Sequence, residues 1–114
     1  MQTDPILRKH LLAAEMDSRN LAAVDVREIR FAPGVQSGRH LHPCPVVGFI
    51  REGTASYQIE GEPVLTLPTG SAFYEPADTV IENFGNASDC DPLIFVAFYL
   101  LDGEQELIRI LEAR

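Results

Sequence analysis

The sequence has little positive charge, no tryptophan, two cysteines and no long hydrophobic run. None of its apolar runs approaches the roughly 20 residues that a membrane-spanning helix needs, so no membrane partner is expected. The apolar stretch that follows the first basic residues, Leu11 to Ala14, is too short for a secretory leader, and we expect a cytoplasmic location. Cys44 and Cys90 are too few for a disulfide framework, so both are expected to be free thiols.

The shortage of positive charge also limits the partners. Nine Lys and Arg stand against 17 Asp and Glu, which gives a net charge of −8. Nucleic-acid affinity comes largely from basic side chains that neutralise phosphates, so no nucleic-acid partner is expected. The sequence also lacks a P-loop, a dinucleotide fingerprint and a G-x-S-x-G elbow. Nucleotide-dependent and acyl-transfer enzymes therefore have no support.

Turn residues recur at short intervals and separate short runs rich in β-branched and aromatic residues, as in Val46–Ile50 and Ala55–Ile59. Many short strands joined by regular turns predict an all-β sandwich or barrel. The run Leu93–Leu101 is apolar on both faces and is expected to be a central strand. A chain of 114 residues is the size of one domain, so we predict a single domain over residues 1–114 with its barrel at about 20–101.

The end of the sequence has a different pattern. Leu107, Ile110 and Leu111 follow the turn pair Asp102-Gly103 at helical spacing. This spacing predicts a short amphipathic α-helix at about 103–113, which packs on the barrel or on a partner chain.

The pair His40 and His42 carries the chemistry. Residues two apart on a strand project to the same face, so both imidazoles are expected on one side of a sheet. Two imidazoles on one face begin a transition-metal site, although a pair of hydrogen-bonded histidines in a polar pocket would have the same spacing.

The surrounding spacing resembles the cupin superfamily. Its first motif is a glycine, five residues, a His-x-His pair and a closing glycine, and its second is a glycine, five residues and a proline followed by an asparagine. The matching residues are Gly34, His40, His42 and Gly53 for the first motif, and Gly70, Pro76 and Asn86 for the second. The resemblance covers residues 20–101 and implies a double-stranded β-helix, or jelly-roll barrel.

The resemblance is incomplete at the ligand positions. Val46 stands where the cupin pattern has a glutamate ligand, and Ile81 stands where it has a third histidine. We therefore predict a partly lost metal site that keeps His40 and His42. Cys44 is a candidate third ligand, but a small residue in a tight turn is the favoured interpretation. Glu75 is expected to be structural, and Glu82 is expected to point away from the site.

The loss of two polar ligands predicts an apolar pocket that keeps its histidines neutral. Aromatic side chains near the motifs are available to line it, with ordinary aromatic core as the alternative. The predicted pocket-lining residues are Val46, Phe49, Tyr57, Phe73, Tyr74 and Ile81.

These features favour a barrel that binds a small molecule beside a degenerate metal site. The first alternative is a metal-dependent enzyme of the dioxygenase, isomerase or decarboxylase type, in which His40 and His42 hold one divalent ion of iron, zinc, manganese or nickel. The second alternative is a non-enzymatic sensor or structural module. Because small members of the superfamily usually pair, we also expect a homodimer.

Overall fold

The short apolar and aromatic runs form nine β-strands in the computed structural model, which describes residues 5–103 and 105–112. Their order along the chain is β1 (Ala23–Phe31), β2 (His40–Leu41), β3 (Val46–Glu52), β4 (Ala55–Ile59), β5 (Leu65–Leu67), β6 (Ala72–Glu75), β7 (Ile81–Asn86), β8 (Leu93–Leu101) and β9 (Arg109–Ile110).

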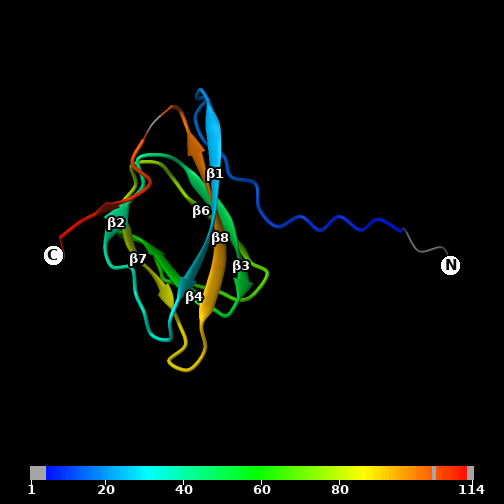
Figure 1. The fold of residues 1–114 in the computed structure, drawn as a ribbon, viewed down its shortest axis with the longest axis vertical. Coiled ribbons are helices and arrows are strands. Elements are labelled where there is room, and N and C mark those ends of the chain that lie inside the picture. The colour runs from blue at the N-terminus through cyan, green and yellow to red at the C-terminus, as the bar shows by residue number, and fades with distance from the viewer. Residues whose placement is uncertain (1–4, 104, 113–114) are drawn as a thin grey trace.

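The strands form two antiparallel sheets that face each other (Figure 1). One sheet has the order β1-β8-β3-β6 and the other has the order β5-β4-β7-β2-β9. Strands that are distant in sequence pair side by side, because β1 pairs along its whole length with β8, and β3 lies between β8 and β6. This arrangement confirms the predicted all-β class.

The core lies between the two sheets. On β8, every second residue is buried, and Phe95 packs edge-on against Phe31 and Phe73. Phe84 of the opposite sheet closes the cluster, with its ring centroid 4.8 Å from that of Phe95. Edge-to-face and tilted aromatic contacts of this kind stabilise a core beyond the area they bury.

The predicted C-terminal helix does not form over the described part of its segment, residues 105–112. Arg109 and Ile110 instead form β9, which pairs with His40 and Leu41 of β2, and the Leu111 N–H donates to the Arg39 carbonyl. A helix of about ten residues is marginal in water without extensive packing, whereas β2 offers an open edge of backbone groups. The pairing satisfies that edge, which explains why the helical spacing was misleading.

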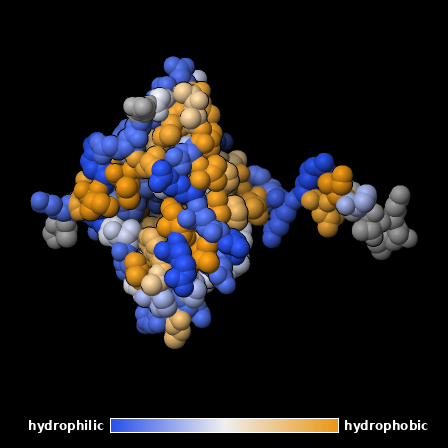
Figure 2. Space-filling model, in the orientation of Figure 1, coloured by the Kyte–Doolittle hydropathy of each residue, from blue (hydrophilic) through white to orange (hydrophobic). Residues whose placement is uncertain are grey.

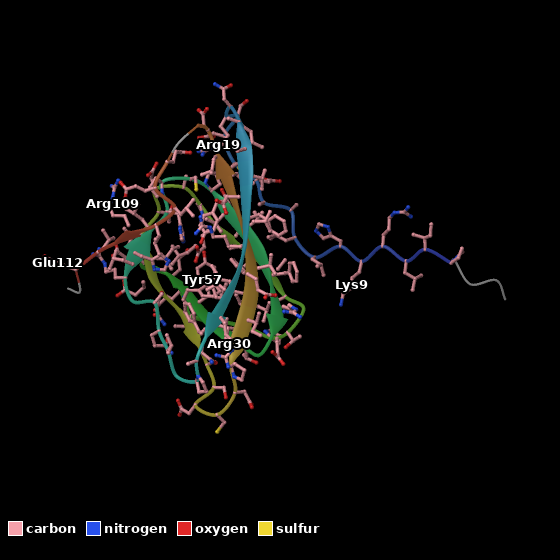
Figure 3. The ribbon with its side chains drawn as sticks, viewed as in Figure 1. Lys9, Arg19, Arg30, Tyr57, Arg109 and Glu112 are labelled. Atoms are coloured by element: carbon pink, nitrogen blue, oxygen red, sulfur yellow. The ribbon has the colours of Figure 1, made fainter. Side chains whose placement is uncertain are left out.

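Residues 5–22, called the N-terminal arm below, form neither helix nor strand. The arm joins the barrel where the Ala22 N–H donates to the Leu101 carbonyl, and its far end runs away from the barrel (Figures 1 and 3). Several of its apolar side chains are exposed: Ile6, Leu7, Leu11, Leu12, Met16 and Leu21. Among residues 5–103 and 105–112 there is no helix of the length and apolar character that crossing a membrane requires.

Asn86 fastens the loops at one end of the barrel. Its buried side-chain amide donates to the carbonyls of Asp91 at 2.7 Å and Ala32 at 3.2 Å, and its oxygen accepts from the Ser88 N–H. One side chain thus joins the loop after β1 to the loop between β7 and β8. Both loops connect strands that contribute to the interior, so Asn86 supports the frame of the barrel.

Replacing Asn86 with alanine should therefore lower the free energy of unfolding by about 2 kcal/mol, because buried backbone groups lose their partners. Urea unfolding measures this change. Asn83→Ala is the control, since Asn83 lies on the same strand and its side-chain hydrogen bonds are near the surface. An equal loss in both variants would contradict the assigned role.

Candidate metal centre

His40 and His42 point into the barrel, where both are almost completely buried, with 2% and 4% of their surfaces exposed. β2 ends at Leu41, and the backbone stays extended enough for both imidazoles to remain on the inner side. Their ring centroids lie 5.0 Å apart. The predicted co-facial pair is therefore present in the structure.

Glu75, which we expected to be structural, lies together with His40 and His42 in the interior. β6 pairs with β3 so that Glu75 lies directly opposite Val46. Cross-strand partners project to the same face, so the Glu75 side chain enters the interior beside Val46. The carboxylate that the motif would place at residue 46 is thus supplied by the neighbouring strand.

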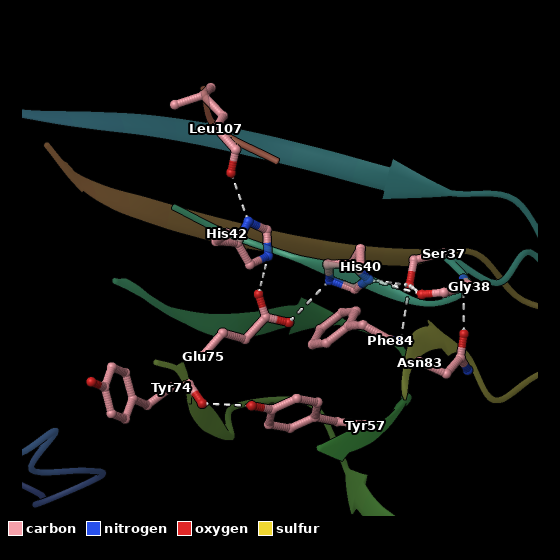
Figure 4. A network of polar contacts seen from close by, with 10 residues as sticks. All are labelled: Ser37, Gly38, His40, His42, Tyr57, Tyr74, Glu75, Asn83, Phe84 and Leu107. Atoms are coloured by element: carbon pink, nitrogen blue, oxygen red, sulfur yellow. Dashed lines mark hydrogen bonds and ion pairs between the residues drawn. The ribbon is translucent and has the colours of Figure 1, made fainter. Parts of the chain in front are cut away.

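The two histidines are held in one tautomer by backbone carbonyls (Figure 4). Nδ1 of His40 lies 2.8 Å from the Gly38 carbonyl, and Nδ1 of His42 lies 2.7 Å from the Leu107 carbonyl. A carbonyl oxygen can only accept, so each Nδ1 carries a proton and donates it. Each Nε2 is left facing Glu75. The distance from Nε2 of His40 to Oε1 is 3.8 Å, and Nε2 of His42 contacts Oε2 directly.

This arrangement requires a positive charge. Two neutral imidazoles would aim Nε2 lone pairs at a buried carboxylate, and like partial charges would repel without water to screen them. A proton or a metal ion between these atoms removes the repulsion. One ligand atom from each of the three residues lies within 4.8 Å of the others. Ligands of one ion at bonds of about 2.0–2.2 Å lie up to about 4.4 Å apart, so the three side chains could hold a single metal ion after a small movement.

Without a metal, the protonation states of Glu75 and His42 depend on each other. Burial raises the pKa of Glu75, but the hydrogen bonds and charges of His40 and His42 outweigh burial, and the net pKa is lowered. Burial lowers the pKa of His42, but Glu75 and the Leu107 carbonyl raise it above its usual range. Glu75, which our expectation of neutral histidines left out, therefore favours the charged form of His42.

A cavity of about 230 Å³ opens beside the three side chains. Most of its wall is apolar, and no Lys or Arg occurs among the described residues that line it. The lining residues are Ile29, Phe31, Ser37, His40, His42, Val46, Phe73, Glu75, Phe84, Phe95, Ala97, Tyr99 and Ile108.

Of the residues predicted to line the pocket, Val46 and Phe73 do so and the other four do not. Phe49 and Tyr74 fall on the outer side of their strands. Ile81 is fully buried beside His40, its partner on β2, and Tyr57 donates its hydroxyl to the Tyr74 carbonyl. The alternation along the strands could have shown this, because successive residues of a strand point to opposite faces. Phe49 on β3 and Tyr74 on β6 are out of phase with the inward residues Val46 and Glu75 of the same strands.

Cys44 does not join His40, His42 and Glu75. Its side chain is completely buried in the hydrophobic core, and burial raises the pKa of its thiol. A protonated thiol is a poor metal ligand. Cys90 is exposed, and both cysteines are free, as predicted. Glu82 lies 3.9 Å from Arg39, away from the centre.

The contribution of the C-terminal segment to the site was not predicted from the sequence. Leu107 supplies the carbonyl that orients His42, and Ile108 forms part of the cavity wall. Both residues depend on β9, whose pairing holds the segment against β2. No motif marks a backbone carbonyl as a partner, so no sequence signal was available for Leu107.

Comparison with known proteins gives a family and a fold. A family model described as the cupin domain matches residues 27–99. No curated protein matches the sequence.

Similar solved structures include a cupin-like protein from Thermotoga maritima, with a TM-score of 0.67 and 22% identity over 77% of this chain and 64% of that one. A DMSP lyase from Ruegeria pomeroyi has a TM-score of 0.66 and 20% identity, over 76% of this chain and 42% of that one. An oxalate oxidase in complex with glycolate has a TM-score of 0.62 and 20% identity, over 77% of this chain and 46% of that one. This chain spans less than two thirds of each, and identities at this level show a shared fold.

The coupled pair Glu75 and His42 predicts how stability depends on pH in metal-free protein. The lowered pKa of Glu75 stabilises the fold above its ordinary value of 4.5, and this is lost as pH falls through the folded value. The raised pKa of His42 stabilises the fold below 6.5, and this is lost as pH rises through the folded value. The contribution of the pair should therefore be largest near pH 5–6.

Urea unfolding in the presence of a chelator measures this effect as the difference in stability between the wild type and His42→Gln. The difference should shrink between pH 6 and pH 9 and again below pH 4. A difference that stays constant from pH 4 to pH 9 would show that the pair does not titrate as described.

Proposed function

This chain belongs to the cupin family, and we propose that it binds one divalent transition-metal ion through His40, His42 and Glu75 and a small, largely apolar ligand beside that ion. The convergence of two Nε2 atoms and one buried carboxylate carries the proposal. Three protein ligands leave positions open for a further ligand, as catalytic metal sites do.

The donor set indicates which metals fit. Two imidazole nitrogens and one carboxylate oxygen form the combination that holds non-haem Fe(II) in oxygenases and Zn²⁺ in some hydrolases. Manganese and nickel accept the same donors. Without a thiolate in the group, a preference for soft ions such as Cu(I) has no support. The metal would supply Lewis-acid polarisation of a ligand oxygen when bound.

The residues of the chain prepare the site for this ion. The carbonyls of Gly38 and Leu107 fix both histidines with Nε2 toward the centre, so neither imidazole has to reorient when it binds. The Glu75 carboxylate stays ionised because its pKa is lowered. The largely apolar walls lower the local polarity, which strengthens the electrostatic interactions inside.

The cavity restricts the ligand. A cavity of 150 Å³ lined by apolar side chains holds a benzene ring, so about 230 Å³ has room for a small ring with a substituent. No cationic side chain lines the wall, so an anionic group on the ligand would need the metal as its partner. An oxygen that binds the metal, attached to an apolar body of modest size, fits both constraints.

Tyr99 is a polar side chain on the cavity wall that is suited to donate a hydrogen bond. Its ring centroid is 5.9 Å from that of His42, and burial together with the charge of Glu75 raises its pKa to about 12. The phenol therefore stays protonated at neutral pH. It would act as a hydrogen-bond donor to the ligand.

The second candidate function is a metal-dependent enzyme, and the similar structures are consistent with it. The similar structures include DMSP lyases and an oxalate oxidase that holds glycolate, which shows that barrels of this shape take small molecules. The open positions of the three-ligand group favour this candidate, whereas a sensor would need the same binding without turnover.

Removing the third ligand tests the metal site. Glu75→Gln should weaken binding of Zn²⁺ or Fe²⁺ at least about 100-fold, because even residues that only orient metal ligands contribute 10–100-fold. Glu82→Gln is the matched control, since Glu82 is half exposed and lies near Arg39. Calorimetric titration of chelator-treated protein measures both affinities.

Near-stoichiometric binding in the wild type and in Glu82→Gln, with loss in Glu75→Gln, supports the proposal. No binding of Fe²⁺, Zn²⁺, Mn²⁺ or Ni²⁺ by the wild type would overturn it. Equal affinities in the wild type and Glu75→Gln would remove Glu75 from the site.

Filling the cavity tests the ligand site separately. Ala97 lies on the wall and is 2% exposed, so Ala97→Leu should occupy the space without touching the three metal ligands. We expect zinc affinity to change less than about threefold, while the stabilisation of zinc-loaded protein by millimolar phenol is lost. Thermal unfolding with and without phenol measures this, and full stabilisation in the variant would contradict a ligand site in this cavity.

A further inference from the structure

The first strand carries an ion pair on its inner face. Ile29 of β1 lines the cavity, and Arg27 and Asp25 stand two and four residues before it, in phase with it along the strand. The register agrees, because Asp25 lies opposite Tyr99 and Arg27 lies opposite Ala97, and both partners are on the cavity wall. Cross-strand partners project to the same face, so β1 directs one anion and one cation to the side of the sheet that holds the cavity.

This ion pair lies at the mouth of the cavity. The side chains of Arg27 and Asp25 are 55% and 32% exposed. Both border a shallow groove that Leu107 of the C-terminal segment also lines, and the next residue, Ile108, belongs to the cavity wall. The groove and the cavity therefore adjoin. The face of the barrel that β1 crosses is hollowed, and hydrophilic and hydrophobic residues both border the hollow (Figure 2).

Asp25 leaves one edge of the Arg27 guanidinium open. The Asp25 carboxylate accepts from Nε at 2.9 Å and from Nη2 at 3.2 Å, which is a side-on pair. Within residues 5–103 and 105–112, Nη1 and the second N–H of Nη2 donate to no acceptor. These parallel donors match the two oxygens of a carboxylate. Because Asp25 already holds the guanidinium in place, a ligand that binds the open edge has less freedom to remove.

Tyr99 connects this mouth with the metal ligands. One row of cross-strand partners crosses the inner face of the sheet from β1 to β6, and it consists of Asp25, Tyr99, Val46 and Glu75. The ring of Tyr99 is 5.9 Å from that of His42, and the charges of Glu75 and Arg27 both act on its hydroxyl. β1 and β6 are three strand spacings apart, about 14 Å. A ligand that reaches from the metal centre to Arg27 would therefore pass along Tyr99.

We propose that Arg27 binds a carboxylate at the outer end of the ligand. This inference rests on the proposed function, since it concerns the ligand of the same cavity. The ligand is then a carboxylic acid with a metal-binding oxygen at one end, an apolar body in the cavity and its carboxylate at the mouth. Inside the cavity an anionic group has only the metal as its partner, whereas at the mouth Arg27 offers two N–H donors.

The charge of the chain makes Arg27 important for such a ligand. A chain with a net charge of −8 repels anions at long range. Among the described residues that line the cavity and the groove, Arg27 is the only Lys or Arg. The side chain that can offset the repulsion thus stands where a carboxylate would leave the apolar interior.

A carboxylate and its matching amide test the inference. Zinc-loaded wild type should bind 3-(4-hydroxyphenyl)propanoate at least about fivefold more tightly than 3-(4-hydroxyphenyl)propanamide, because a bidentate Arg–carboxylate pair is stronger than a neutral contact even where it is partly exposed. Arg27→Gln should abolish this preference and leave the affinity for the amide within about twofold. Calorimetric titration measures all four affinities.

Arg51→Gln is the matched control. The side chain of Arg51 is 57% exposed and pairs with Glu28, and neither residue lines the cavity or the groove. This variant should keep the full preference for the carboxylate. Arg27→Lys, which keeps the charge without the planar fork, should keep part of it.

Three results would overturn the inference. They are equal affinities of the wild type for both ligands, a preference that survives in Arg27→Gln because the carboxylate binds zinc instead, and equal weakening of both ligands by Arg27→Gln, which would mark a merely structural role. In each case binding of zinc and of the amide by the wild type would leave the proposed function standing. A wild type that binds neither zinc nor either ligand would overturn the proposed function and this inference together.

Discussion

The interior of this barrel depends on one electrostatic constraint, which is that a buried carboxylate faces two imidazole lone pairs in a cavity with largely apolar walls. A negative charge without a partner would be several kcal/mol unfavourable in such a place. The hydrogen bonds from Nδ1 of His40 and His42 to backbone carbonyls prevent the rings from turning away. The positive charge that balances the Glu75 carboxylate therefore has to come from a proton shared with His42 or from a metal ion.

The rest of the molecule positions these three groups. β3 and β6 pair in the register that sets Glu75 opposite Val46, and β2 is held between β7 and β9. The aromatic cluster around Phe84 and Phe95 forms part of the cavity wall. A shift of β6 by one residue would turn Glu75 to the outer side and bring Tyr74 inward, so the chemistry of the centre depends on strand register.

The fold was predictable because its signals are local. Turn residues, β-branched runs and the spacing of the histidine pair each act within a few residues, and together they indicate an all-β barrel with His40 and His42 inside. The third member of the centre, Glu75, was missed because its role arises from pairing with a strand about 30 residues away in sequence. The C-terminal strand was missed for the same kind of reason, since Leu107, Ile110 and Leu111 fit a helix locally while the open edge of β2 decides their conformation.

The contact between His42 and the Leu107 carbonyl has a consequence for how the protein is made. The ligands His40, His42 and Glu75 are all synthesised before the residue that fixes the ring of His42. While residue 107 is still inside the ribosome, that imidazole lacks its carbonyl partner and the barrel lacks both β9 and the wall at Ile108. The final geometry of the three-residue centre therefore forms only after this segment has emerged and paired with β2.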